Sequence, residues 1–254
     1  MNGFRNFWKA DFARRGISMA VIIHHFYSSA LTECNSMTVI VPVEKAERTS
    51  YPVLWLIPPF GGDHTAWLRH TNMERLAEEN AFMIVMPDMK LSFGTDMVHG
   101  FKYHTMLTKE LPQVLCQVYP ADLSQQMIAG AKEGAYTALY SSLTCEGQYR
   151  KTIALSCGSL TDENLPKNLQ KPFFYAFGTD NMADLSNTDY DVCSSLDSWK
   201  DLDTWFLAWS CKDTYHSSCE RLSSYLRAGS VKEYKGASFS WKEWESVLKD
   251  VFNG

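Results

Sequence analysis

The sequence lacks an apolar run long enough to cross a membrane as a helix. The longest apolar stretch near the start, residues 17–23, stops at His24 and His25, whereas a membrane helix takes roughly 18 or more apolar residues. No A-x-A-like cleavage site follows this stretch, so we expect no signal peptide. These absences predict a protein with no membrane partner.

Paired cysteine motifs are also missing. The seven cysteines include no C-x-x-C pair; they are Cys34, Cys116, Cys145, Cys157, Cys193, Cys211 and Cys219. An odd, scattered set is typical of reduced thiols in a cytoplasmic protein. Cys211, His216 and Cys219 come closest to metal-ligand spacing, but structural zinc usually takes a fourth ligand. We therefore expect a cytoplasmic location, no metal and no cofactor.

Basic residues are not in excess, and no linker or repeat divides the chain. The 24 Lys+Arg and 29 Asp+Glu residues give a net charge of −5, which argues against a nucleic-acid partner. Of the 254 residues, 45% are apolar and 21% are charged, as in a globular domain. We predict an N-terminal extension over residues 1–18 and a single α/β domain over residues 19–254.

Short apolar runs alternate with helical patterns along the chain. After an early strand that holds His24 and His25, the predicted strands span residues 36–43, 52–57, 82–87, 126–130, 151–156 and 204–210, and the predicted helices span 66–80, 104–118, 135–145, 217–228 and 240–251. The continuous apolar run at 53–57 is typical of a parallel strand buried on both faces. The order predicts an α/β fold whose mostly parallel sheet has helices on both faces. We interpret the less regular segment 161–203 as an excursion over the sheet's end.

The turn after the strand at 126–130 has an unusual central residue. It reads Gly130-Ala131-Lys132-Glu133-Gly134 and precedes a helix. A strand, a G-x-X-x-G turn and a helix form a nucleophile elbow, whose glycines let strand and helix approach closely around a strained central residue. The central residue here is Lys132 instead of serine.

At this point the chain resembles a known family. The matching pieces, in order, are Phe26-Tyr27-Ser28-x-x-Leu31, Tyr51-Pro52-Val53-Leu54, Gly61-Gly62 with Trp67, Thr71-Asn72-x-Glu74-Arg75-Leu76-Ala77-Glu78-Glu79, Met86-Pro87, Gly94-Thr95-Asp96, Lys109-Glu110-Leu111-Pro112, Ile128-Ala129-Gly130 and Trp241-x-x-Trp244. They resemble the tributyrin esterase branch of the esterase D and S-formylglutathione hydrolase family. The resemblance implies an α/β-hydrolase fold, a carboxylesterase of short acyl esters or acylated sugars, and self-association.

The positions that carry catalysis in this family differ here. The resemblance places the family's nucleophile on Lys132, its acid on Asp213 and its base on Phe239. Acyl transfer by a triad needs a hydroxyl, an imidazole that takes its proton and a carboxylate that orients the imidazole. Only the carboxylate is kept.

The loop that would form the oxyanion hole is altered as well. The family's H-G-x-G-G becomes Pro58-Pro59-Phe60-Gly61-Gly62, and each proline removes a backbone N–H. The resemblance places the two oxyanion donors on Phe60 and Glu133, and the Glu133 carboxylate would oppose a developing negative charge. The expected pocket residues are Pro58, Pro59, Gly61, Gly62, Trp67 and Asp96.

Lys132 has two interpretations. It is either a reactive amine with a lowered pKa or a lysine paired with Asp213 or Glu133, and we favour the ion pair because a half-buried carboxylate beside Phe239 needs compensation. A residue other than glycine at the elbow apex costs on the order of 1–3 kcal/mol, so we expect the apex to be partly relaxed.

Other side chains are candidates for a displaced catalytic group. They are the imidazoles of His64, His99, His104 and His216 near the predicted mouth, and the hydroxyls of Ser156 and Ser159. For the four histidines, solvated or hydrogen-bonded side chains are the favoured interpretation. For the two serines a structural role is favoured, because serines after a strand more often cap a turn. Asp96 is expected to fix a loop.

Three functions follow from these residues. The leading hypothesis is a catalytically silent esterase homologue whose pocket binds a small-molecule ligand. The second is an active carboxylesterase that acts on acyl esters with relocated groups. The third is a structural or partner-binding protein, a homo-oligomer to which residues 1–18 contribute.

Overall fold

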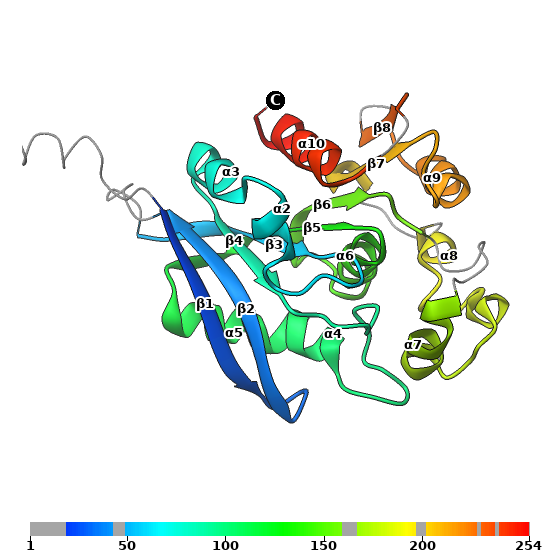
Figure 1. Ribbon diagram of the computed structural model, residues 1–254, viewed down its shortest axis with the longest axis horizontal. Helices are drawn as coiled ribbons and strands as arrows, with labels where there is room; N and C mark the ends of the chain where they lie inside the picture. The colour runs from blue at the N-terminus through cyan, green and yellow to red at the C-terminus, as the bar shows by residue number, and fades with distance from the viewer. Residues whose placement is uncertain are drawn as a thin grey trace, which may run out of the picture.

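The computed structural model describes residues 19–42, 49–158, 167–196, 202–227, 230–236 and 239–253. These residues form one sheet of eight strands in the order β1-β2-β4-β3-β5-β6-β7-β8 (Figure 1). The strands are β1 Met19–Ser28, β2 Glu33–Pro42, β3 Tyr51–Ile57, β4 Met83–Pro87, β5 Ala121–Ala131, β6 Tyr149–Leu155, β7 Trp205–Ser210 and β8 Val231–Tyr234. The β1–β2 and β2–β4 pairs are antiparallel and the others are parallel, which confirms the predicted mostly parallel sheet.

Helices cover both faces of the sheet, as predicted. They are α2 Ala66–His70, α3 Met73–Asn80, α4 Tyr103–Thr105, α5 Leu111–Val118, α6 Glu133–Thr144, α7 Lys167–Phe177, α8 Val192–Leu196, α9 His216–Ser223 and α10 Trp241–Asn253, with a π-helical turn at Met106–Glu110 and 3-10 turns at Met182–Leu185 and Leu202–Thr204. Helices α2, α3 and α10 lie on one side of the sheet and α4, α5 and α6 on the other (Figure 1).

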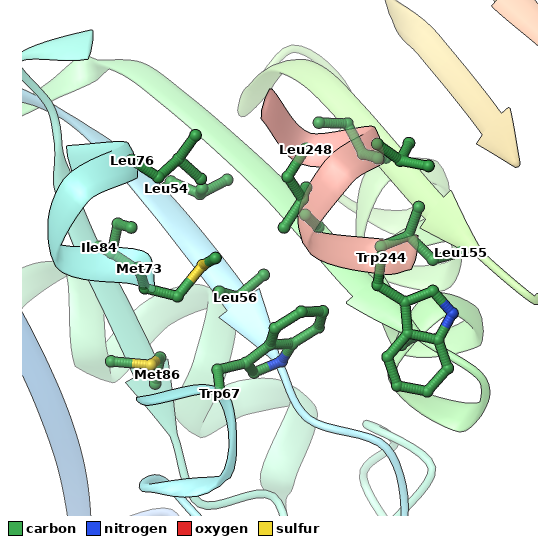
Figure 2. Packing of buried hydrophobic residues seen from close by; sticks show 14 of the residues in the cluster. Leu54, Leu56, Trp67, Met73, Leu76, Ile84, Met86, Leu155, Trp244 and Leu248 are labelled. Atoms are coloured by element: carbon green, nitrogen blue, oxygen red, sulfur yellow. The ribbon is translucent and has the colours of Figure 1, made fainter. Parts of the chain in front are cut away.

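The central strand β3 shows how the sequence divides the core. Leu54 and Leu56 point to the side of α3 and α10, while Val53, Trp55 and Ile57 point to the side of α4 and α5. Successive side chains of a strand face opposite ways, so an unbroken apolar run supplies two cores. Figure 2 shows the first of these cores, in which Trp67 and Trp244 belong to the same buried cluster as Leu56.

The helix expected at 66–80 is two helices. Thr71 is extended, with φ −143° and ψ 167°, and the Asn72 side chain accepts a hydrogen bond from the Arg75 N–H at 3.3 Å. An asparagine in that position caps a new helix, so α3 begins at Met73 in a different direction.

The helix expected at 104–118 has a π-helical turn in its middle. Pro112 has no N–H to donate to the carbonyl four residues earlier, and the Thr108 carbonyl accepts a bond from Gln148 Nε2 at 3.2 Å instead. The N–H of Leu111 reaches back to the Met106 carbonyl. Side-chain bonding of a freed carbonyl thus lets the helix continue past a proline.

The expectation of an irregular 161–203 segment was wrong for much of it. Residues 167–177 form α7, which contains Pro172 and buries Leu169, Phe173, Ala176 and Phe177 at helical spacing. Parts of this segment, and the predicted extension 1–18, lie outside the described residues. Strand β8 was not predicted, because it is only four residues long and its side chains are partly exposed.

The buried indole of Trp55 gives a test of the central sheet. Its Nε1 donates to Gln126 Oε1 at 2.9 Å, and both residues are buried. Trp55→Phe leaves that amide oxygen without its donor, which costs about 1–3 kcal/mol of unfolding free energy. Denaturant unfolding measures the loss, and the double variant Trp55→Phe/Gln126→Leu is the control, since it removes both partners and should recover part of it.

Candidate functional site

The elbow keeps its strained backbone although its apex is lysine. Lys132 has φ 53° and ψ −117°, a region that residues other than glycine rarely adopt. Its N–H donates to the Leu155 carbonyl of β6 at 2.8 Å, and α6 begins at the next residue. The expectation of a relaxed apex was therefore wrong.

Two glycines hold the elbow against its neighbours. A Cβ added to Gly130 would lie 2.1 Å from the Gly134 carbonyl oxygen, and a Cβ added to Gly134 would lie 2.5 Å from the Pro58 carbonyl oxygen. Strand β5, helix α6 and the end of β3 therefore pack backbone to backbone at this point. The G-x-X-x-G pattern predicted this approach.

The Lys132 side chain is half-buried. Within the described ranges it forms no ion pair, so the expected pairing with Asp213 or Glu133 is absent. Both carboxylates accept hydrogen bonds from other donors.

The Glu133 carboxylate lies on the expected oxyanion donor. Its Oε2 accepts the Phe60 N–H at 3.2 Å and its Oε1 accepts the Tyr215 hydroxyl at 2.7 Å. Glu133 is 7% exposed and is the first residue of α6, where the helix dipole favours a negative charge. The protein's own carboxylate thus occupies the Phe60 N–H, one of the two N–H groups that the resemblance assigns to an oxyanion hole.

Asp213 is left without an imidazole. Its Oδ1 accepts the Tyr215 N–H at 3.1 Å, and its buried Oδ2 has no hydrogen-bond partner among the described residues. Phe239 is 8% exposed and its ring lies 5.2 Å from that of Tyr234. The residue expected at the position of the base therefore belongs to the same packed core cluster as Trp244.

Tyr215 joins the acid loop to the elbow, and sequence reasoning missed it. Its backbone reaches Asp213 and its hydroxyl reaches Glu133. Its ring lies over Gly158, where an added Cβ would be 2.8 Å from Cδ1. Its position two residues after Asp213 could have indicated a place near the site. Only the folded loop shows that its hydroxyl points to Glu133.

The expected pocket residues separate into two groups. Gly61 and Gly62 line a cavity of about 830 Å³, together with residues of the loops at 88–92 and 97–103 and of α7. Pro58 and Pro59 are buried, and Trp67 is a core residue whose Nε1 donates to the Ile57 carbonyl at 3.0 Å. Neither Lys132 nor Glu133 lines this cavity.

Asp96 fixes a loop, as expected. Its Oδ1 accepts the Thr105 N–H at 2.8 Å and its Oδ2 accepts the Thr105 hydroxyl at 2.6 Å. These bonds join the loop at 96–102 to the helical segment that follows it.

Three serine or threonine hydroxyls lie within hydrogen-bond distance of an imidazole among the described residues. They are Ser36 Oγ with His25 Nδ1 at 2.7 Å, Thr38 Oγ1 with His64 Nδ1 at 2.8 Å, and Thr144 Oγ1 with His104 Nε2 at 2.9 Å. None includes an elbow residue. Burial lowers the pKa of His64 and of His104, which keeps both imidazoles neutral near pH 7.

The remaining candidates have structural contacts. His99 stacks on Phe174, and His216 lies 3.5 Å from Glu220 and 3.4 Å from Glu233. Ser156 is fully buried and its Oγ accepts the Trp244 Nε1–H at 3.3 Å. Ser159 lies outside the described residues.

In the part of the chain that the structure describes, no group of three or more His, Cys, Asp or Glu side chains is arranged to hold a metal ion. None of the helices formed by the described residues has the length and apolar character that a membrane crossing takes.

The chain is similar to esterases in sequence pattern and in fold. A family model described as Putative esterase matches residues 28–218, about three quarters of the 254 residues. Among solved structures, the fluorophosphonate-binding serine hydrolase F of Staphylococcus aureus superposes with a TM-score of 0.77 at 20% identity, over 92% of this chain and 97% of that one. The S-formylglutathione hydrolase of the same organism gives 0.76 at 21% identity, over 92% and 98%. MPT51 of Mycobacterium tuberculosis gives 0.71 at 13% identity, over 92% and 97%.

These solved structures have the α/β-hydrolase fold that the resemblance implied. The sheet of this chain, with helices on both faces, has the same architecture. A search of curated proteins finds no matching sequence.

The packing of the elbow is tested at Gly134. Gly134→Ala places a Cβ against the Pro58 and Ile57 carbonyl oxygens, so we expect a loss of about 3 kcal/mol in unfolding free energy. Gly147→Ala is the matched control, because Gly147 has φ +77° but open space around it and should lose only about 1 kcal/mol. Equal losses from the two substitutions, measured by denaturant unfolding, would contradict the backbone contact.

Proposed function

The chain belongs to the esterase family, and from its site we propose that it is a catalytically silent member that binds a small-molecule ligand without hydrolysing it. The observation that carries this proposal is the contact of the Glu133 carboxylate with the Phe60 N–H. Silence then has three separate causes: an amine replaces the nucleophile, a packed ring replaces the base, and a carboxylate covers an oxyanion donor.

The charge at the elbow is the strongest of these arguments. Removing one oxyanion donor costs an esterase-like reaction about 10²–10³ in rate. Here the donor is not removed but already bonded to an anion that Tyr215 also holds. A tetrahedral intermediate would have to displace Glu133 and place its own negative charge beside it, which Coulomb repulsion opposes.

The alternative is an active carboxylesterase with relocated groups, as the resemblance also allows. The Ser36–His25 pair is the specific observation behind it, because a serine hydroxyl 2.7 Å from an imidazole can be activated. The two residues face each other across the antiparallel β1–β2 pair, away from the elbow. No carboxylate bonds to His25 among the described residues, so this pair lacks the third group that would orient it.

Hydrolysis of p-nitrophenyl acetate and butyrate tests the proposal. We expect the wild-type protein to show no turnover above that of Lys132→Ala, which is the control for aminolysis by surface lysines. Turnover that Lys132→Ala abolishes would show that the elbow amine is catalytic, and turnover that Ser36→Ala abolishes would establish the relocated pair. Either result overturns the proposal.

The role of Glu133 is tested by restoring the family residues. Lys132→Ser/Phe239→His supplies a nucleophile and a base but leaves the carboxylate on the Phe60 N–H. We expect this double variant to gain little, and the triple variant that adds Glu133→Ala to exceed it by roughly 100-fold in kcat/KM, the worth of one oxyanion donor. Equal rates for the two variants would show that Glu133 is not an obstacle.

A further inference from the structure

Exposed apolar side chains gather around the mouth of the 830 Å³ cavity. Among the described residues, five of the ten large apolar residues that are exposed belong to its loops or to α7: Leu91, Val98, Phe101, Phe174 and Tyr175. Leu91, Phe101 and Tyr175 line the cavity directly. Apolar rims of this kind are typical of ligand pockets.

The wall that α7 contributes is fixed in place. The N–H groups of Val98 and His99 donate to the carbonyls of Ala176 and Tyr175 at 3.0 and 2.9 Å. Asp96 ties the same loop to Thr105. The two sides of the cavity are therefore joined by backbone bonds, and the cavity is formed before a ligand binds.

The acidic groups of the lining already have donors. Asp88 accepts the Lys90 ammonium at 2.5 Å and the Lys90 N–H at 3.2 Å. Asp63 accepts the Thr65 N–H and hydroxyl at 2.8 and 2.6 Å and lies 3.4 Å from Arg69. These carboxylates leave little negative charge to attract a cationic ligand.

Lys171 and Tyr103 of the lining, by contrast, have no hydrogen-bond or ion-pair partner among the described residues. Lys171, on α7, forms no ion pair with any residue in the described ranges. Tyr103 is 4% exposed and its hydroxyl has no hydrogen-bond partner among the same residues. Burial raises the pKa of Tyr103 to about 12, so this hydroxyl stays a donor at neutral pH.

We propose that the cavity binds an amphiphilic monocarboxylate, with its apolar body against Leu91, Phe101 and Tyr175 and its carboxylate on Lys171. A single unpaired ammonium beside a mainly apolar surface matches one negative charge on an apolar body. A phosphate would call for more cations or a helix N-terminus. This inference rests on the proposed function in one respect: the protein binds the ligand and does not hydrolyse it.

The experiment compares matched ligands on matched variants. Decanoate, 3-phenylpropanoate and the neutral decan-1-ol are titrated below their aggregation limits and followed by calorimetry. We expect decanoate to bind about fivefold to tenfold more tightly than decan-1-ol at low salt, because a charged donor strengthens the bond to the acid. Lys171→Gln should remove that preference, while Lys167→Gln, an exposed lysine of the same helix outside the cavity lining, should keep it.

The apolar contact has its own variant. Phe101→Ala should weaken decanoate and decan-1-ol by the same factor, because the ring contacts the chain and not the carboxylate. Binding of either acid with this dependence on Lys171 supports the inference, and the two acids distinguish a chain from a ring as the apolar body. No binding of either acid, or a preference that survives Lys171→Gln, overturns it.

These outcomes are separate from those of the hydrolysis assay. A protein that turns over esters but binds decanoate through Lys171 contradicts the proposed function alone. A protein that neither turns over esters nor binds the acids contradicts the carboxylate site alone.

Discussion

The backbones of β5, α6 and the end of β3 pack closely where Gly130 and Gly134 have no Cβ, and the rest of the site depends on this contact. It holds Lys132 in its strained conformation, and it fixes where α6 begins. Because Glu133 is the first residue of that helix, the same contact aims its carboxylate at Phe60 on the neighbouring loop. At the position where the resemblance expects a nucleophile elbow, the scaffold here places a carboxylate on the Phe60 N–H, the expected oxyanion donor.

The rest of the site is consistent with that arrangement. Tyr215 holds Glu133 from the acid loop, Phe239 fills the place of an imidazole with core packing, and Asp213 keeps a buried oxygen without a partner. The packing at Gly130 and Gly134 holds Lys132 in its strained conformation, although the Lys132 side chain carries no nucleophilic hydroxyl. The proposed binding site is the cavity lined by Gly61 and Gly62, whose lining does not include the Lys132 side chain.

Much of the fold could be predicted from the sequence, because its signals are local. The apolar run at β3 and the G-x-X-x-G turn each fix a conformation within a few residues, and they predicted the buried parallel strand and the close strand–helix packing. Helix α7 was missed because Pro172 indicated a break, although the spacing of Leu169, Phe173 and Ala176 supports a helix. The direction of the Glu133 and Tyr215 side chains depends on two loops far apart in sequence, and no pattern reports it. The cavity is likewise made by segments that only the fold brings together.

The proposed function requires that no side chain in the described part of the chain is activated for attack on an acyl or phosphonyl centre. Intact-protein mass spectrometry after treatment with a fluorophosphonate tests it most directly, because the reagent forms a covalent adduct with an activated serine and needs no turnover. The account predicts that the mass of the wild-type protein stays unchanged, while Lys132→Ser/Phe239→His/Glu133→Ala gains one adduct on the introduced serine. A stoichiometric adduct on the wild-type chain would contradict the account, because it would show that the chain contains an activated nucleophile.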